Sequence, residues 1–124
     1  MIIRKELLFE GSKGELNMVA MFDSGATYSC ITPEKAEKIA VLLTIRHPFK
    51  VQTASKGHFI VINNVVRLDF YIGKSHFSDE FIVVPNLSED VIIGAATLQK
   101  WRFHLDFEHD DVIFDPAVTK IQLM

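Results

Sequence analysis

Short runs of alternating apolar and polar residues, separated by turn residues, fill most of the chain. Side chains of a strand point alternately to its two faces, so this pattern is typical of strands with one buried face. Paired runs around turn residues predict β-hairpins. Four such pairs occur: residues 6–23 around Gly11-Ser12-Lys13-Gly14, residues 49–53 and 58–62 around TASKG, residues 65–73 and 76–84 around Gly73-Lys74-Ser75, and residues 103–107 and 112–116 around Glu108-His109-Asp110-Asp111.

Two segments depart from the strand pattern and predict short helices. Thr32 suits an N-cap and Pro33 the first helical position. A stripe at helical spacing follows, formed by Ala36, Ile39, Ala40 and Leu43. Residues 91–101 begin as a β-branched run, break at Gly94 and continue with helix formers. The pattern as a whole predicts a mostly β protein with one or two short helices.

Length and composition fit one folded domain over residues 1–124. Apolar residues make up 48% of the chain and charged residues 23%, which is typical of globular proteins. The net charge of −3 gives no basis for binding nucleic acid. No apolar run approaches the roughly 20 residues of a membrane span. The first residues, MIIRKELLFEG, lack the features of a signal peptide, so we expect a cytoplasmic location.

The cysteine and histidines give little sign of metal or redox chemistry. Cys30 is the only cysteine, lies among apolar residues and is best interpreted as a small buried side chain. The five histidines form no HExxH pair or Cys/His cluster, and the acidic segment DFEHDD lacks calcium-loop spacing. It is better interpreted as a solvated turn. We expect no metal site and no cofactor.

The segment AMFDSGATYSCI, residues 20–31, places polar groups within apolar strand material. Asp23 is therefore expected to be partly desolvated. Gly25 permits a tight turn and close approach of a ligand, and Ser24 can brace the turn through hydrogen bonds. One carboxylate cannot easily act as both acid and base, whereas two close carboxylates share a proton because like charges separate their ionisations. By itself, however, Asp-Ser-Gly is also common in ordinary turns.

The combination of this segment with VIIGAATL resembles the retropepsin-like aspartic proteases, single-domain relatives of pepsin that work as homodimers. FDSGAT is similar to their first signature, and VIIG followed by a short helix is similar to their second. The likeness in element order covers approximately residues 5–115. The resemblance implies a closed β-barrel-like acid-protease fold and an aspartic endopeptidase, a hydrolase that cleaves peptide or protein substrates without a cofactor.

The resemblance also implies roles for individual residues. Asp23 would be the catalytic carboxylate, one from each protomer. Ser24 would link the two active loops, Gly25 would present its carbonyl to substrate, and Ala26 and Thr27 would line a subsite. The remaining implied residues are a flap tip, formed by Thr53, Ala54, Ser55, Lys56, Gly57 and His58, and a support beneath the loop, formed by Ile92, Ile93 and Gly94.

The chain departs from this family pattern at two places and leaves alternatives open. Ala96 stands where the family often has Asp or Asn, which removes a hydrogen-bonding anchor, and the flap has only one glycine. A dimeric peptide-binding module without useful turnover is therefore an alternative, as is a structural β-domain with an incidental turn. Residues 119–124 are a candidate interface strand. Trp101 is expected to pack in the core and His58 to lie on a solvated hairpin.

Overall fold

The strands close into a mixed barrel in the computed structural model, which describes residues 2–53 and 57–120. The hydrogen-bonded order is β1-β2-β7-β3-β6-β5-β4, and β5 also pairs with β1, so six strands form a closed ring with β4 outside it. The strands are β1 (Ile3–Glu10), β2 (Glu15–Phe22), β3 (Cys30–Ile31), β4 (Leu43–Gln52), β5 (Phe59–Ile72), β6 (Ser75–Val83) and β7 (Val91–Ile93).

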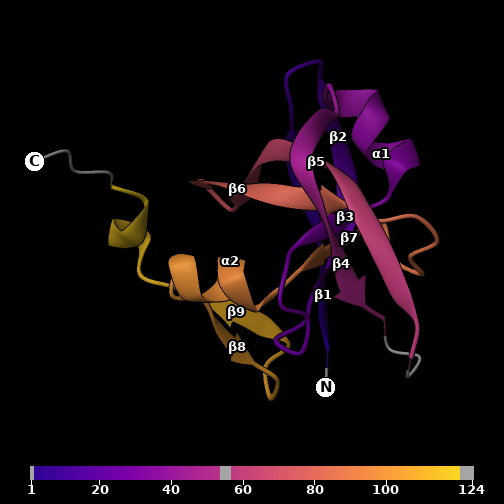
Figure 1. Ribbon diagram of the computed structural model, residues 1–124. Helices are drawn as coiled ribbons and strands as arrows, with labels where there is room; N and C mark the ends of the chain where they lie inside the picture. The colour runs from indigo at the N-terminus through magenta and orange to yellow at the C-terminus, as the bar shows by residue number, and fades with distance from the viewer. Residues whose placement is uncertain (1, 54–56, 121–124) are drawn as a thin grey trace, which may run out of the picture.

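Two short α-helices and a separate strand pair complete the fold. Figure 1 shows α1 (Pro33–Ile39) at the upper right and α2 (Ala95–Lys100) at the lower left, beside the pair β8 (His104–Asp106) and β9 (Asp111–Ile113). A 3₁₀ turn, η1 (Pro116–Thr119), follows. None of the helices within the described residues has the length and apolarity to cross a bilayer. The mostly β prediction with two short helices is confirmed.

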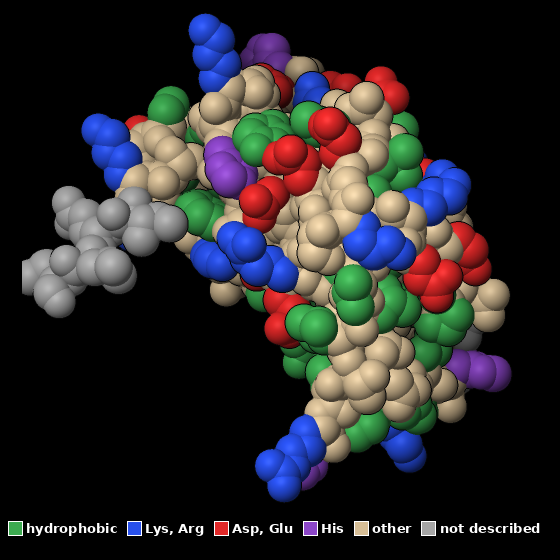
Figure 2. Space-filling view, turned by 90° about the horizontal axis from the view of Figure 1, so that it is seen from above, with side chains coloured by type: hydrophobic (Ala, Val, Ile, Leu, Met, Phe, Trp, Pro, Cys, Tyr) green, Lys and Arg blue, Asp and Glu red, His purple; other side chains and the backbone are tan. Residues whose placement is uncertain are grey.

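The four predicted hairpins are all present. β1 pairs with β2, β4 with β5, β5 with β6 and β8 with β9, each in antiparallel register. The acidic segment forms the β8–β9 turn, where the His109 ring lies 2.7 Å (Nδ1 to Oδ2) from Asp106 and lowers the pKa of that carboxyl. On the face seen from above (Figure 2), acidic and basic side chains are interspersed.

The first helix ends earlier than its apolar stripe predicts. Thr32 holds the N-cap position and Pro33 begins the helix, but Ala40 is already extended at φ −150°. Leu43, expected on the helix, starts β4 and is 55% exposed, so that part of the prediction is wrong. The β1–β2 turn diverts the chain, because the Lys13 amide donates to the Ile39 carbonyl at 2.8 Å and the Val41 amide donates to Ser12 Oγ at 3.1 Å.

Aromatic side chains fill the barrel. Phe77 is fully buried, stacks on Phe70 at 5.4 Å between centroids and meets Trp101 edge-on at 5.3 Å. Trp101 is 8% exposed and packs in the core as predicted. A second apolar cluster lies under the β4–β5 hairpin, with Ile62 at its centre and Cys30 packed against it. Two cores therefore stabilise the fold, one inside the barrel and one beneath the hairpin.

Replacing Phe77 by alanine should destabilise the fold strongly. The substitution empties the centre of the aromatic cluster, and a Phe→Ala change in a core costs about 3–5 kcal/mol. Equilibrium unfolding in urea measures the loss. Phe59→Ala is the matched control, because Phe59 is 59% exposed and its removal should cost only about 0.5 kcal/mol. Equal costs for the two variants would contradict this description of the core.

Cys30 should react slowly with thiol reagents while the protein is folded. Burial raises the pKa of the Cys30 thiol to about 11, and its Sγ donates to the Tyr28 carbonyl at 3.3 Å. Because the thiolate is the reactive form, alkylation at pH 8 should be about 10²-fold slower than for an ordinary free thiol. Mass spectrometry after timed iodoacetamide treatment measures the rate, with the protein unfolded in guanidinium as control. An equal rate in the two states would show that the thiol is not shielded.

Candidate active site

The loop of residues 23–29, called here the DSG loop, runs from the end of β2 to the start of β3. Strand β7 lies between those two strands, parallel to β2 and antiparallel to β3. The DSG loop therefore has to arch over the end of β7. Phe22 is paired with Ile93, and the Asp23 amide donates to the Ile93 carbonyl at 2.9 Å. Asp23 is thus fixed where β2 and β7 end together.

The Asp23 carboxylate is held by its own loop. Its Oδ1 accepts a hydrogen bond from the Gly25 amide at 2.9 Å, and its backbone carbonyl accepts one from the Ala26 amide at 3.2 Å. These two bonds form a tight turn whose first side chain has a defined direction. Asp23 and Ala26 are half-buried, whereas Ser24, Gly25 and Thr27 are exposed. The loop therefore presents a braced carboxylate at the protein surface.

The second predicted motif lies directly beneath the DSG loop. The Ala95 amide donates to the Ala26 carbonyl at 2.6 Å, and the Ala96 amide donates to the Thr27 carbonyl at 3.1 Å. Gly94, the residue before these two, is buried. A Cβ at this position would lie 2.5 Å from the Tyr28 carbonyl oxygen and 2.7 Å from that of Ala26. Only glycine fits there, so the two motifs are joined by backbone contacts.

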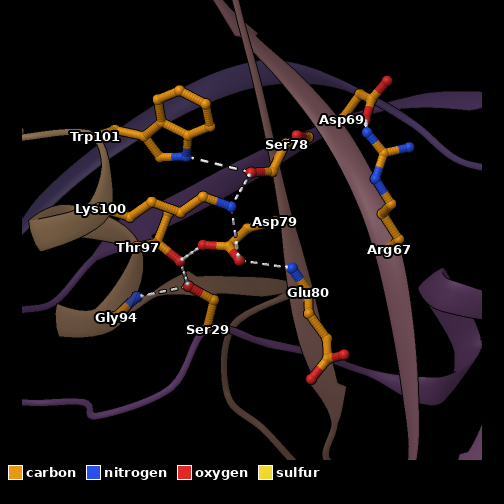
Figure 3. Close-up of polar contacts among 10 residues, drawn as sticks. All are labelled: Ser29, Arg67, Asp69, Ser78, Asp79, Glu80, Gly94, Thr97, Lys100 and Trp101. Atoms are coloured by element: carbon orange, nitrogen blue, oxygen red, sulfur yellow. Dashed lines mark hydrogen bonds and ion pairs between the residues drawn. The ribbon is translucent and has the colours of Figure 1, made fainter. Parts of the chain in front are cut away.

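A chain of buried polar groups, which the sequence did not reveal, supports the same place (Figure 3). The Gly94 amide donates to Ser29 Oγ at 3.0 Å, and Ser29 Oγ lies 2.5 Å from Thr97 Oγ1. Thr97 Oγ1 donates in turn to Asp79 Oδ2 on β6 at 2.7 Å. The sequence offers one sign of this chain: a hydroxyl residue lies within each of two apolar runs, Ser29 in YSCI and Thr97 in AATL. Ala96, where the sequence lacks a polar anchor, is exposed, and its neighbour Thr97 is buried and makes two of these hydrogen bonds.

The β4–β5 hairpin meets the DSG loop through aromatic rings. Tyr28 is 44% exposed, and its ring centroid lies 5.7 Å from that of Phe49 on β4. At the predicted flap tip, the Thr53 amide donates to the His58 carbonyl at 3.0 Å, and Gly57 has a positive φ of 81°. His58 is exposed, as predicted for a solvated hairpin. Ala54, Ser55 and Lys56 lie outside the described residues.

An open groove on the surface of the described residues begins at the DSG loop. That groove has a volume of ≈ 550 Å³ and extends from Ser24 along α2 to the β8–β9 pair. Its lining is mainly apolar, with contributions from Ala95, Leu98, Phe103, Leu105 and Phe107. Within residues 2–53 and 57–120, no three His, Cys, Asp or Glu side chains form a group that could hold a metal ion.

Three solved structures show what the chain is similar to. The retroviral protease-like domain of Ddi1 from Leishmania major has a TM-score of 0.69 at 18% identity, over 93% of this chain and 89% of that one. The foamy viral protease-reverse transcriptase has a TM-score of 0.50 at 21% identity, over 77% of this chain and 12% of that one. A retropepsin-like aspartic protease from Rickettsia conorii has a TM-score of 0.49 at 20% identity, over 86% and 83%.

A match between the sequence and a family model identifies the family. Residues 10–97 match the family model described as Aspartyl protease. That span includes β2, the DSG loop, the β4–β5 hairpin and the Gly94 turn, and therefore both predicted signatures. Since it covers well over half of the chain and the fold agrees, this protein belongs to the aspartyl protease family and has its retropepsin-like fold.

Proposed function

We propose that the protein is an aspartic endopeptidase that works as a homodimer of one domain per chain, residues 1–124. The observation that carries the proposal is the placement of Asp23. Each chain contributes one braced carboxylate on an exposed loop, at the position where the two family signatures meet. Acid and base catalysis by carboxylates needs two of them at short range. A twofold axis at the DSG loop would bring the second Asp23 from the partner.

The reaction follows from the different protonation of the two Asp23 side chains. Two carboxylates that share a site cannot both ionise easily, so one proton is held between them. The ionised Asp23 takes a proton from a bound water, whose oxygen attacks the scissile carbonyl carbon. The protonated Asp23 donates its proton to the carbonyl oxygen, which gives a neutral tetrahedral intermediate. As the C–N bond breaks, the first Asp23 gives the water proton to the leaving nitrogen and the second Asp23 takes a hydroxyl proton from the intermediate, so the pair again holds one proton. The mechanism requires no metal or cofactor.

Family membership suggests roles for the residues around Asp23. Ser24 would make hydroxyl-to-backbone bonds across the dimer, since it is exposed on the loop next to the axis. Gly25 would offer its carbonyl to the substrate main chain, and Ala26 and Thr27 would line a subsite. Ile92, Ile93 and Gly94 would support the loop from below. Residues 53–58 would close over an extended peptide of about six to eight residues, bound through strand-like hydrogen bonds.

The groove that begins at Ser24 supports the position of the partner. Phe107, which is 36% exposed, and the half-buried Leu105 give it apolar surface, and Gln99, Arg102 and His104 also line it. Covering apolar surface of this kind favours association. The candidate interface strand at residues 119–124 gives less support, because Thr119 belongs to η1 and residues 121–124 lie outside the described residues.

Replacing Asp23 by asparagine should abolish peptide cleavage and leave a folded dimer. An amide neither accepts the proton of water as a base nor donates an acidic proton, so we expect a loss of at least about 10³-fold in kcat. Cleavage of an internally quenched peptide library measures activity, and sedimentation velocity measures the dimer. Asp110→Asn is the matched control, since Asp110 lies on the exposed β8–β9 turn at φ 50°, which asparagine also tolerates.

Other outcomes of that experiment would identify the alternatives. Full activity of Asp23→Asn would overturn the assignment of the catalytic carboxylate. If the wild-type protein is a dimer that binds peptides but cleaves none, and binds a statine-type transition-state mimic only weakly, it is a peptide-binding module. A monomer that binds neither would indicate a structural β-domain.

A further inference from the structure

Helix α2 is attached to β6 by two of its side chains and by Trp101, which caps it (Figure 3). Thr97 Oγ1 donates to Asp79 Oδ2, Lys100 Nζ lies 3.6 Å from Asp79 Oδ1, and Trp101 Nε1 donates to the Ser78 carbonyl at 3.2 Å. Lys100 Nζ also donates to that carbonyl, at 3.3 Å. A six-residue helix has little stability of its own, so these contacts with the barrel wall determine where α2 and the turn before it lie.

The donors and acceptors fix the direction of the buried hydrogen-bond chain. The Gly94 amide can only donate, so Ser29 Oγ accepts from it. An ionised Asp79 can only accept, so Thr97 gives its single hydroxyl proton to Oδ2. Thr97 Oγ1 must then accept the Ser29 proton, although the 2.5 Å contact by itself permits either direction. The chain runs from Gly94 through Ser29 and Thr97 to the Asp79 carboxylate.

This hydrogen-bond chain is buried where it meets the DSG loop. Ser29 is 3% exposed and Thr97 is 1% exposed, whereas the Asp79 side chain retains 18%. Leaving a buried hydroxyl or amide without a partner costs more free energy than the hydrogen bond itself contributes. Each group in the hydrogen-bond chain therefore depends on the presence of the next. Because an ionised group ends the chain, every hydrogen bond in it is polarised in the same sense. Loss of Thr97 Oγ1 would leave both Ser29 and Asp79 without this partner.

The hydrogen-bond chain ends at Gly94, in the same turn that supports Asp23. The Ile93 carbonyl accepts from the Asp23 amide, and the Ala95 amide donates to the Ala26 carbonyl. Gly94, between them, donates to Ser29. A displacement of Gly94 would therefore move both backbone supports of the DSG loop. Small errors in the position of a catalytic group reduce turnover strongly, by as much as about 10²-fold for 1 Å.

We infer that Thr97 and Asp79 are positioning residues for Asp23, acting through Ser29 and Gly94 in place of the anchor that Ala96 does not provide. Neither side chain touches substrate or the reacting atoms. The inference rests on the proposed peptidase function where turnover is concerned, but its structural part concerns only the order of the Gly94 turn. These two parts can be measured separately.

Thr97→Val tests the inference with almost no change of shape, and Thr97→Ser restores the hydroxyl. Hydrogen exchange followed by NMR reports the order of the turn. We expect the Gly94 and Ala95 amides to exchange about 10- to 100-fold faster in Thr97→Val, while Phe70 in the barrel changes little. Thr44→Val, which removes an exposed hydroxyl on β4, is the matched control and should leave these amides unchanged.

Peptide cleavage by the same variants reports the effect on Asp23. Thr97→Val should lower kcat about 10- to 100-fold and change KM less than about twofold, since the chain contacts no substrate. Thr97→Ser should recover both kcat and slow exchange. Should Thr97→Val not fold, Asp79→Ala, which removes the terminal acceptor from a partly exposed site, replaces it with the same expected results.

The exchange data separate failure of this inference from failure of the proposed function. Unchanged exchange at Gly94 and Ala95 would overturn the positioning role whether or not the protein cleaves peptides. Faster exchange with kcat unaffected would also overturn it. If wild-type protein cleaves nothing, the peptidase proposal fails, and faster exchange in Thr97→Val with recovery in Thr97→Ser would still establish the ordering of the turn.

Discussion

The candidate site depends on a backbone-to-backbone contact at Gly94. The DSG loop crosses the end of β7 so closely that a Cβ on Gly94 would lie 2.5 Å from the Tyr28 carbonyl oxygen. Because no side chain intervenes, the amides and carbonyls of the two segments bond directly, and the Asp23 backbone is fixed to β7. Backbone bonds of this kind define the position of the carboxylate more closely than flexible side chains could. The barrel brings β2, β7 and β3 side by side and thereby makes the contact possible.

Such a contact needs support from within the apolar barrel, where polar groups are costly unless they are paired. The Ser29 and Thr97 hydroxyls meet this condition by ending in a carboxylate near the surface, where Lys100 and solvent share its charge. On α2, Ala96 is exposed, whereas the buried Thr97 donates a hydrogen bond to Asp79 of β6.

The geometry of one chain also explains why the proposed function involves two. Asp23 has a defined direction, through its bond to Gly25, but the loop around it remains exposed at Ser24, Gly25 and Thr27. An exposed loop beside an apolar groove is an expected feature of a surface that a second copy would cover. Family membership makes the same suggestion, because carboxylates acting as an acid and a base must come in pairs. The β4–β5 hairpin packs on the same loop, because the Phe49 ring lies 5.7 Å from that of Tyr28.

The sequence by itself determined the hairpins, the start of α1 and the two motifs, because alternation, capping and turn chemistry are local properties of neighbouring residues. It also indicated the family, since FDSGAT and VIIG are short contiguous signals. Tertiary structure alone decided the end of α1, where Ser12 and Lys13 of the distant β1–β2 turn form hydrogen bonds with the backbone of Val41 and Ile39. It likewise decided the pairing of Ser29 with Thr97, 68 residues apart, and of Thr97 with Asp79. Each hydroxyl has many possible partners in the sequence, and only closure of the barrel brings these particular partners within hydrogen-bonding distance.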